Sequence, residues 1–481
     1  MNVSNKYLQV EKYVKQAIEN GLFQPEDKLP SIRQLCDKLD VSKNTVIRAY
    51  QELEAVGYIY SVPRSGYRVN SLSTITESEP TTPMDVDLLS MAKSILSYPE
   101  GKQLLATGSA HPNTDSPAIK SLYANVGRHS RMQSQIPSHY QLPPGNERLV
   151  QQLLKISQDL GVTTAKNEIA VTNGAQQAIT LALRALTNVG DIVIVESPCY
   201  FGNLLLLESL GLKALEIPSH VATGIDIPSV KKALDLWDVK AIVVTPNFNN
   251  PTGSQMPLSH RQALLDVSED TPIIEDDVFG GLSAGKHIPS LKTLDKKGRV
   301  IYVNSLSKTL DSRLRIGWLL SERYQKQIEK HMICENMGSL NLMQSAAGEF
   351  LTTGKYRMHV DKMRRLYQNN LKQFSALLSQ ALDQYPLLKN QYHISRPNGS
   401  FLTWLTLPIQ TDSHQIYLAC KKKKINILPG SVFATTGQYD NCIRLSVANF
   451  KDEPQWRKGI HALAELINQH LTSNSIETPK T

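Results

Sequence analysis

Apolar strands alternate with helical patterns over much of this chain, and the alternation limits the folds open to it. Short aliphatic and β-branched runs predict strands at Glu168–Thr172, Asp191–Glu196, Ala214–Ile217, Ala241–Thr245, Pro272–Glu275, Val300–Asn304 and Gly317–Leu320. Helical periodicity lies between most of them, as at Ala178–Leu186. Strands separated by helices predict an α/β fold whose sheet is mostly parallel and covered on both faces.

The length and local composition predict more than one domain. A chain of 481 residues exceeds one typical domain of roughly 100–200 residues. We expect a first domain at 1–70, a linker at 71–98 and a large domain at 99–475, with a small carboxyl-terminal α/β subdomain from about 390. Ser71–Pro83 is rich in Ser, Thr, Pro and Glu, as flexible linkers are, and residues 84–100 are compatible with a first helix of the next domain.

Cysteine usage and hydropathy favour a cytoplasmic protein. The five cysteines are odd in number and show no paired spacing, which argues against disulfides and against a metal site. Charged residues run through the first fifteen positions, unlike a signal peptide. Apolar runs such as Leu204–Leu207 are far shorter than the roughly 20 residues that span a bilayer, so no membrane association is expected. The net charge of +8 permits nucleic-acid binding without requiring it.

A lysine follows one of the predicted strands. Ser305, Ser307 and Lys308 come directly after the apolar run at 301–304, at the carboxyl end where open α/β sheets place their ligands. Burial and neighbouring cations lower a lysine pKa, and the neutral amine forms a Schiff base with an aldehyde. Taken alone, the motif favours an ordinary surface lysine, so the other residues around it have to decide.

A phosphate site is predicted beside this lysine. A glycine-containing turn after the strand at 168–172 opens a helix, whose free backbone amides bind anions. An arginine seven residues after Lys308 can hold the same phosphate with two hydrogen bonds. The predicted phosphate contacts are Gly174, Ala175, Gln176, Ser305, Ser307 and Arg315.

Other polar groups suit an aromatic, nitrogen-containing ring. Three acids in a row, Glu275–Asp277, end a strand, and buried carboxylates need cations; a protonated ring nitrogen is one. Tyr200 can stack on a ring, or it can be a core residue. Asn250 lies in Asn249–Gly253, otherwise a plain turn, and Arg444 can receive a carboxylate or form a surface ion pair.

The first seventy residues predict three helices and a hairpin. Apolar residues at helical spacing mark helices that end near Gly21, begin at Ser31 with a capping-box pattern, and begin at Ser42. Two strands, Tyr58–Val62 and Tyr67–Val69, follow. This arrangement is a winged helix-turn-helix.

This segment resembles the DNA-binding domain of GntR-type bacterial regulators, through Leu29–Arg33 and Val41–Val46. The resemblance implies that the third helix enters the major groove, that two arginines meet phosphates and that the wing approaches the minor groove or backbone. Lys43 stands where the family usually has arginine. The alternative is a polar face that is merely solvated. The implied DNA contacts are Arg33, Ser42, Lys43, Asn44, Thr45, Arg48, Arg64 and Gly66.

Residues 100–470 resemble the fold-type I aminotransferases that depend on pyridoxal phosphate. The resemblance rests on Asn-Pro-Thr-Gly, the strand-end Asp, Ser-x-Ser-Lys and Arg-x-Gly in that order. It implies that Lys308 is the Schiff-base lysine and that Asp276, rather than Asp277, pairs with the pyridine nitrogen. Asn250 would donate to the ring oxygen and Arg444 would receive the ligand carboxylate. Tyr140 resembles the tyrosine that reaches the partner's phosphate, which implies a homodimer.

Two positions depart from the aminotransferase pattern. Val278 and Phe279 stand where a tyrosine usually bonds the ring oxygen. Arg313, two before Arg315, replaces a common glycine; it either adds a second cation near the phosphate or faces solvent.

Together the two halves resemble the MocR subgroup of GntR regulators. The resemblance implies a transcription factor that binds promoter DNA and senses pyridoxal phosphate, an amino acid or another amine. A rival interpretation is a working aminotransferase with an appended DNA-binding domain. A third is an architectural DNA-binding protein whose cofactor site is lost.

Overall fold

The structure is a computed structural model of the 481-residue chain. It describes residues 6–19, 23, 27–55, 58–62, 66–69, 82–83, 102–162, 164–285, 287–338 and 340–477. Contacts divide the chain into two compact units, each taken by itself: residues 1–79 with 220–223, and residues 80–219 with 224–481. Most of the predicted linker at 71–98, and the helix at 84–100, lie outside the described residues.

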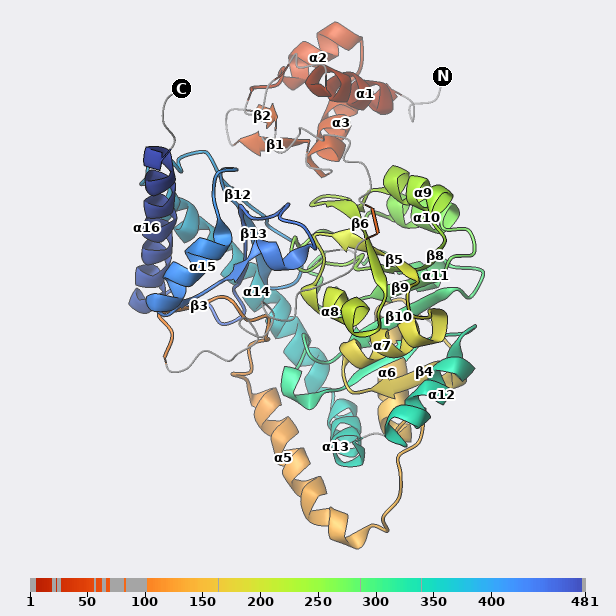
Figure 1. The fold of residues 1–481 in the computed structure, drawn as a ribbon. Coiled ribbons are helices and arrows are strands. Elements are labelled where there is room, and N and C mark those ends of the chain that lie inside the picture. Colours follow the sequence, from red (N-terminus) through yellow and green to blue (C-terminus); the bar gives the residue numbers. More distant parts are fainter. Residues whose placement is uncertain are drawn as a thin grey trace. The chain divides into compact units, whose positions relative to one another are not determined.

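The first unit contains the predicted three helices and hairpin (Figure 1). The helices are α1 (Lys6–Glu19), α2 (Ile32–Leu39) and α3 (Lys43–Ala55), and antiparallel β1 (Ile59–Val62) and β2 (Gly66–Val69) form the hairpin. Their apolar faces meet in one core that contains Val10, Val14, Leu35, Val46, Tyr50 and Leu53. The predicted capping box is confirmed, because the Ser31 amide donates to Gln34 Oε1 (2.7 Å) and the Gln34 amide to Ser31 Oγ (3.3 Å).

An eight-stranded sheet organises the second unit. Its order is β4-β11-β10-β9-β8-β5-β6-β7. The strands are β4 (Ile169–Thr172), β5 (Ile192–Ser197), β6 (Lys213–His220), β7 (Gly224–Ile225), β8 (Val239–Val244), β9 (Ile273–Asp276), β10 (Val300–Ser305) and β11 (Gly317–Leu320). All seven predicted strands are confirmed within a few residues, and β7 was not predicted.

The pairing is mostly parallel, with one reversal. β10, β9, β8, β5 and β6 run parallel, whereas β11 is antiparallel to both β10 and β4. Between β10 and β11 the chain makes turns at 306–310 and a short 3₁₀ helix at Ser312–Leu314. A parallel neighbour would need a longer crossover, so the chain turns back directly.

Helices cover both faces of the sheet. Val193 and Val195 of β5 pack with α7 (Ala175–Leu186), α8 (Phe201–Ser209) and α12 (Gln325–Asn336). Ile194 packs on the other side with α9 (Ile227–Leu236), α10 (Leu258–Val267) and α11 (Leu291–Leu294). The two-residue period of a strand therefore divides its side chains between two cores, as the apolar runs predicted.

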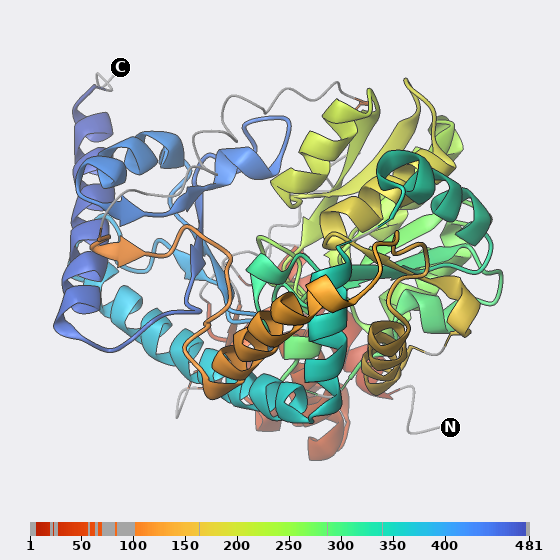
Figure 2. The ribbon, with the colours of Figure 1, turned by 90° about the horizontal axis from the view of Figure 1, so that it is seen from below.

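Three further helices pack on the part of the sheet formed by β4, β11 and β10. α5 (Pro117–Met132) and α6 (Glu147–Asp159) both pack against α13 (Asn341–Thr352), and Figure 2 shows α5 meeting α13 at an angle. Within the described ranges, no helix combines the length and hydropathy needed to cross a membrane. The five cysteines are free.

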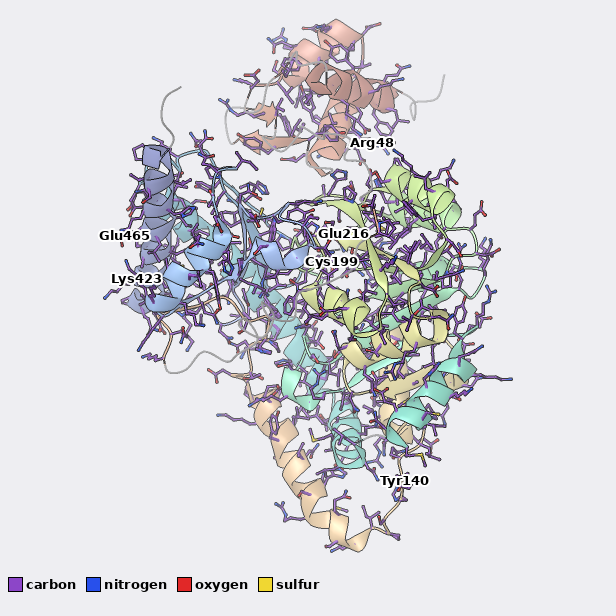
Figure 3. All side chains as sticks on the ribbon, in the orientation of Figure 1. Arg48, Tyr140, Cys199, Glu216, Lys423 and Glu465 are labelled. Carbon is purple, nitrogen blue, oxygen red and sulfur yellow. The ribbon has the colours of Figure 1, made fainter. Side chains whose placement is uncertain are left out.

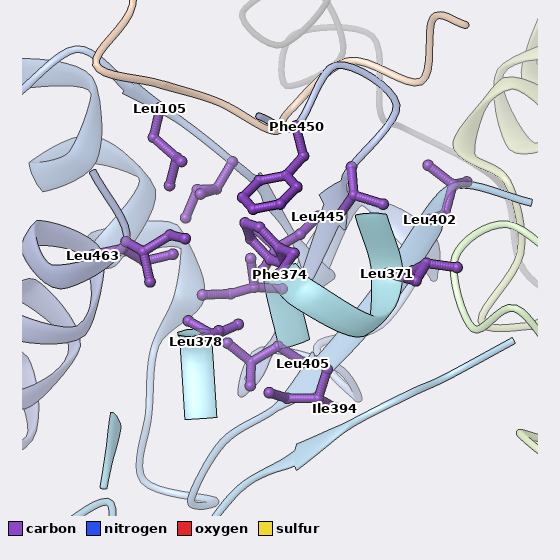
Figure 4. Packing of buried hydrophobic residues seen from close by; sticks show 14 of the residues in the cluster. Leu105, Leu371, Phe374, Leu378, Ile394, Leu402, Leu405, Leu445, Phe450 and Leu463 are labelled. Atoms are coloured by element: carbon purple, nitrogen blue, oxygen red, sulfur yellow. The ribbon is translucent and has the colours of Figure 1, made fainter. Parts of the chain in front are cut away.

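A four-stranded antiparallel sheet builds the small subdomain. Its order is β12-β13-β16-β15: His393–Ile394, Leu402–Thr406, Cys442–Ser446 and Leu428–Pro429. α14 (Lys355–Leu382), α15 (Ser413–Lys422) and α16 (Pro454–Glu477) cover it. Figure 4 shows Phe374 and Leu378 of α14 packed with Leu405, Leu445 and Leu463.

The core of this subdomain extends beyond the predicted range of about 390–475. Besides α14, it contains Leu105 of β3 (Leu105–Ala106), which pairs with β14 (Ile425–Asn426). The lysines at 421–424 are exposed at the end of α15, where Lys423 lies 3.7 Å from Glu465 (Figure 3). They form a solvated run of positive charge.

Candidate functional site

Polar residues gather where the parallel strands end. β10 ends at Ser305 and β9 at Asp276, and the turn containing Asn250 follows β8. Tyr200 comes shortly after β5 and precedes the first residue of α8. Since these four strands are neighbours and run the same way, their carboxyl ends bring the predicted residues to one edge of the sheet.

Lys308 lies in the turn after β10, among charged groups. Burial, Arg444 and Arg315 lower its pKa to about 8, while Asp276 acts in the opposite direction. Its Nζ donates to the carbonyl oxygen of Ala110 (2.8 Å) and lies 5.7 Å from the ring centroid of Phe279. A larger fraction of this amine is therefore neutral at pH 7 than of an ordinary lysine, as a nucleophilic amine requires.

The two adjacent aspartates have different surroundings. Asp277 accepts hydrogen bonds from the Tyr302 hydroxyl (2.6 Å) and Asn247 Nδ2 (2.7 Å), so both of its oxygens have partners. Asp276 accepts one from the Val278 amide (3.2 Å), and burial raises its pKa to about 6. Asp276 is the carboxylate that interacts electrostatically with Lys308.

Buried partners stabilise the other acids of this run. Glu275 accepts from the Leu291 and Lys292 amides, both at 2.9 Å, at the start of α11. Arg261 is fully buried and lowers the pKa of Glu275 and Asp277, against the larger upward effect of burial. Arg261 is therefore the buried cation near the Glu275 and Asp277 carboxylates. It lies on α10, which the sequence analysis did not identify as part of the site.

The glycine turn, the arginine and the two serines that were predicted to bind a phosphate lie at this edge of the sheet. Gly174 precedes α7 with φ 87°, and a Cβ there would lie 2.5 Å from Arg315 Nη2. That Nη2 donates to the Asn173 carbonyl (3.0 Å). Ser305 Oγ donates to Ser307 Oγ (2.8 Å), which places both hydroxyls together. The exposed arginine and the first amides of α7 suit an anion.

Some predicted contacts already have intramolecular roles. Gln176 Nε2 donates to the Gly202 carbonyl (2.7 Å), so its side chain connects α7 to α8. Tyr200 is a neighbour of Asp276, Arg444 and Arg315, and burial raises its pKa. It therefore belongs to the site rather than to a distant core.

Several buried side chains carry polar atoms without partners among the described residues, and two of these side chains belong to the predicted site. They are Asn250, with Oδ1, and Arg444, with Nε and Nη1. Arg444 is 2% exposed, and burial lowers its pKa to about 10. Buried polar atoms are costly without partners, so these atoms favour a polar ligand. The amine, the acid, the asparagine, the arginine and the anion site fit a phosphorylated pyridine aldehyde and a carboxylated amine.

Sequence reasoning missed the residue that holds the asparagine turn. Glu196, at the end of β5, accepts from the Thr245 amide (2.7 Å) and Asn249 Nδ2 (2.9 Å). Burial raises its pKa to about 7. Glutamate at the end of an apolar strand was the available signal.

Sequence reasoning also missed the segment that precedes α5. Arg444 Nη2 donates to the Gly108 carbonyl, and the Lys308 amine donates to Ala110 two residues later. These contacts use backbone oxygens, which leave no signature in the side-chain sequence.

The two departures have clear positions. Phe279 is buried beside Phe401, with ring centroids 5.5 Å apart, and presents a ring without a hydroxyl near Lys308. Arg313 is exposed and pairs with Asp311 (2.6 Å), with its guanidinium 5.1 Å from the Tyr123 ring. Of the two alternatives for Arg313, the structure favours the solvent-facing one.

The winged helix-turn-helix formed by the first seventy residues, here called the head, carries a candidate DNA-binding surface. A groove of about 620 Å³ is lined by Pro30, Ser31, Ile32, Arg33, Cys36, Lys43, Gly66 and Tyr67. The exposed predicted contacts are Arg33, Ser42, Lys43, Asn44, Arg48 and Gly66.

Two of the predicted DNA contacts, Thr45 and Arg48, also make contacts within the head. Thr45 is 9% exposed and its Oγ1 lies 2.8 Å from Ser42 Oγ, so its hydroxyl serves the start of α3 instead of facing outward. The Arg48 guanidinium lies 4.1 Å from the Tyr7 ring. Arg64 lies outside the described residues.

Tyr140 is 71% exposed on the connection between α5 and α6 (Figure 3). That connection contacts the start of α13, where Asn341 Nδ2 lies 3.2 Å from His139 Nε2. Its exposure leaves the hydroxyl available to a second molecule.

Comparison with known proteins agrees with both halves. The family model for bacterial regulatory proteins of the gntR family matches residues 6–69, and that for aminotransferase class I and II matches residues 120–462. The uncharacterized HTH-type transcriptional regulator YjiR of Escherichia coli (strain K12) is 32% identical over 92% of this chain and 95% of its own. The chain belongs to the MocR-type GntR regulators.

More distant proteins extend the comparison. The HTH-type transcriptional regulator NorG of Staphylococcus aureus (strain USA300) is 28% identical over 88% of this chain and 95% of its own. A kynurenine aminotransferase of Pyrococcus horikoshii is similar in structure, with TM-score 0.69 and 24% identity, over 81% of this chain and 96% of its own. The fold is therefore a GntR winged helix-turn-helix followed by a fold-type I aminotransferase domain, and the cofactor of this MocR-type chain is pyridoxal phosphate.

Proposed function

We propose that this MocR-type chain regulates transcription by binding promoter DNA in a manner that depends on pyridoxal phosphate or an amino compound. One observation carries the proposal. A winged helix with exposed Lys43 and Asn44 is covalently continuous with a site that holds Lys308, Asp276 and Arg444. Polar side chains on a recognition helix read base edges, and an amine-binding site supplies a chemical signal.

The residues divide the work of holding the cofactor. When bound, pyridoxal phosphate supplies an aldehyde and an electron-withdrawing ring. Lys308 would provide the amine that captures it, Asp276 would hold a proton on the ring nitrogen, and Asn250 would donate to the ring oxygen. Arg444 would bind the carboxylate of an amino compound. The amides at Gly174 and Ala175, with Gln176, Ser305, Ser307, Arg315 and the stacked Tyr200, would complete the site.

We also propose a homodimer in the cytoplasm. Tyr140 would donate to the cofactor phosphate of the partner, which its exposure permits. Two heads on one dimer would then contact two half-sites about one helical turn, or a multiple, apart.

An active aminotransferase is the second candidate. The presence of Lys308, Asp276 and Arg444 in one site favours it. Phe279 weighs against efficient turnover, since no hydroxyl at that position can bond the ring oxygen. Conversion of added amino acids at enzyme-like rates, followed by absorbance, would favour the aminotransferase.

The test is a footprint on the DNA upstream of the chain's own reading frame, with and without pyridoxal phosphate. We expect the wild type to turn yellow, to give a borohydride-trapped adduct on Lys308 and to change its footprint. Lys308→Ala should lose all three, whereas Lys326→Ala, at an exposed position of α12, should keep them. The proposal would be overturned if neither the footprint nor the affinity for DNA changed when pyridoxal phosphate was added or Lys308 was replaced by alanine.

A further inference from the structure

The segment at 102–116, here called the strap, connects the small subdomain to the candidate site. It begins on the small subdomain, where Leu105 is buried and β3 pairs with β14. The Thr107 amide (3.0 Å) and hydroxyl (2.8 Å) both donate to the Asn426 carbonyl, and the Ser446 amide donates to Thr107 (2.7 Å). The strap is thus anchored two residues from Arg444 of β16.

The next residues of the strap contact two cations of the candidate site, Arg444 and Lys308. The Gly108 carbonyl accepts from Arg444 Nη2 and the Ala110 carbonyl from Lys308 Nζ (2.8 Å). His111 Nδ1 then lies 2.9 Å from Ser312 Oγ, in the turn that follows Lys308. Three residues within 108–111 therefore contact Arg444, the amine of Lys308 and the loop between β10 and β11.

Gly108 fits its place closely. A Cβ at Gly108 would lie 2.1 Å from Asn426 Oδ1 and 2.6 Å from Asn426 Cγ. An alanine there would force the strap or the Asn426 side chain to move. The absence of a side chain at Gly108 therefore allows the strap to lie directly against the Asn426 amide.

Ligand chemistry acts on the same atoms that bind the strap. A carboxylate on Arg444 would share one guanidinium with the Gly108 carbonyl. Condensation of the Lys308 amine with an aldehyde forms a C=N bond and releases water, which leaves at most one N–H on that nitrogen. The hydrogen bond to Ala110 is then changed or lost, so site occupancy alters the forces on the strap.

We propose that the strap transmits occupancy of the cofactor and amine site to the chain that leads to the DNA-binding head. The inference rests on the proposed function. It adds the element that transmits the change. The strap contains the first described residues of the large domain after the predicted linker at 71–98. A shift of Gly108 and Ala110 is passed on covalently, without any new contact with the head.

Hydrogen exchange and DNA affinity test the strap on the full chain, stripped of and reloaded with pyridoxal phosphate. In the wild type we expect peptides from 102–116 to change exchange rate, and DNA affinity to change, by about 5-fold or more, the range of typical allosteric coupling. Gly108→Ala should keep the yellow band while its DNA affinity responds less than about 2-fold, well below that range. Gly285→Ala is the matched control, because a Cβ there meets no atom within 4 Å. It should respond as the wild type does.

A second variant protects the test against misfolding of the first. Thr107→Val keeps the shape of a buried side chain and removes one hydrogen bond to Asn426, so it should also weaken the response. The inference is overturned if loaded wild-type protein shows no change in the strap, or if both strap variants respond as the wild type does. That result leaves the proposed function intact. A protein that binds no pyridoxal phosphate overturns the proposed function, and the strap inference with it.

Discussion

At the scale of single residues, the adjacent acids Asp276 and Asp277 should separate cofactor binding from stability. In Asp277→Asn, an amide replaces an oxygen that accepts from Tyr302 or Asn247, so one buried donor loses its partner. We expect a loss of about 1–3 kcal/mol in the free energy of unfolding. Asp276→Asn should keep the stability and weaken the binding of pyridoxal phosphate. Urea unfolding and absorbance titration measure the two effects, and the opposite pattern would assign the ring-nitrogen partner to Asp277.

The pH dependence of cofactor capture follows from the lowered pKa of Lys308. With a pKa of about 8, roughly one tenth of the amine is neutral at pH 7, and the neutral fraction rises until pH passes the pKa. The rate at which the visible band appears should therefore increase with pH and level off above about pH 8. For a lysine with the ordinary pKa of 10.5, the rate would continue to increase up to about pH 10.5.

Two substitutions give the directional controls. Arg444 lowers the Lys308 pKa, so Arg444→Met should move the midpoint to higher pH. Asp276 raises it, so Asp276→Asn should move the midpoint to lower pH. A midpoint unchanged by both substitutions would show that neither Arg444 nor Asp276 sets the pKa of the amine.

At the scale of the element, the start of α3 combines a structural cap with exposed polar residues. Ser42 Oγ accepts from the Thr45 amide (3.3 Å), so Ser42→Ala should cost the head about 1 kcal/mol of stability. Asn44 is exposed, so Asn44→Ala should preserve stability while weakening specific DNA binding by about 1–3 kcal/mol. Thermal unfolding and DNA titration at fixed salt separate the two. If Asn44→Ala lowers the stability of the head as much as Ser42→Ala does, the assignment of Asn44 as a DNA contact without a structural role is contradicted.

At the scale of the whole molecule, Tyr140 provides a test of the dimer. Sedimentation should give twice the chain mass of 53.6 kDa. Tyr140→Phe should weaken cofactor binding about 10-fold or more, because a hydrogen bond to a charged group contributes about 1.5–3 kcal/mol.

Mixing the variants distinguishes a shared site from a local one. A heterodimer of Tyr140→Phe with Lys308→Ala has one site with an intact lysine and an intact partner tyrosine. Wild-type affinity should therefore return to one site per dimer. If Tyr140 serves its own chain, mixing restores nothing.

Periodicity and ordered motifs determined the elements of this molecule. Local sequence patterns predicted the seven strands, the capping box at Ser31 and the three helices of the head. These patterns involve residues only a few positions apart, so they can be recognised in the sequence. The order of motifs around Lys308 and Asp276 likewise implied the site, because parallel strands bring their ends together by geometry.

Only the tertiary structure decided which groups meet across long separations. The hydrogen bonds of Asp277 with Tyr302 and Asn247 distinguish it from Asp276, although the two acids are adjacent in sequence. The contacts of Gly108 and Ala110 with Arg444 and Lys308 use backbone oxygens 336 and 198 residues away. Every residue carries such an oxygen, so its partner is fixed by how the chain packs and not by which side chain it bears.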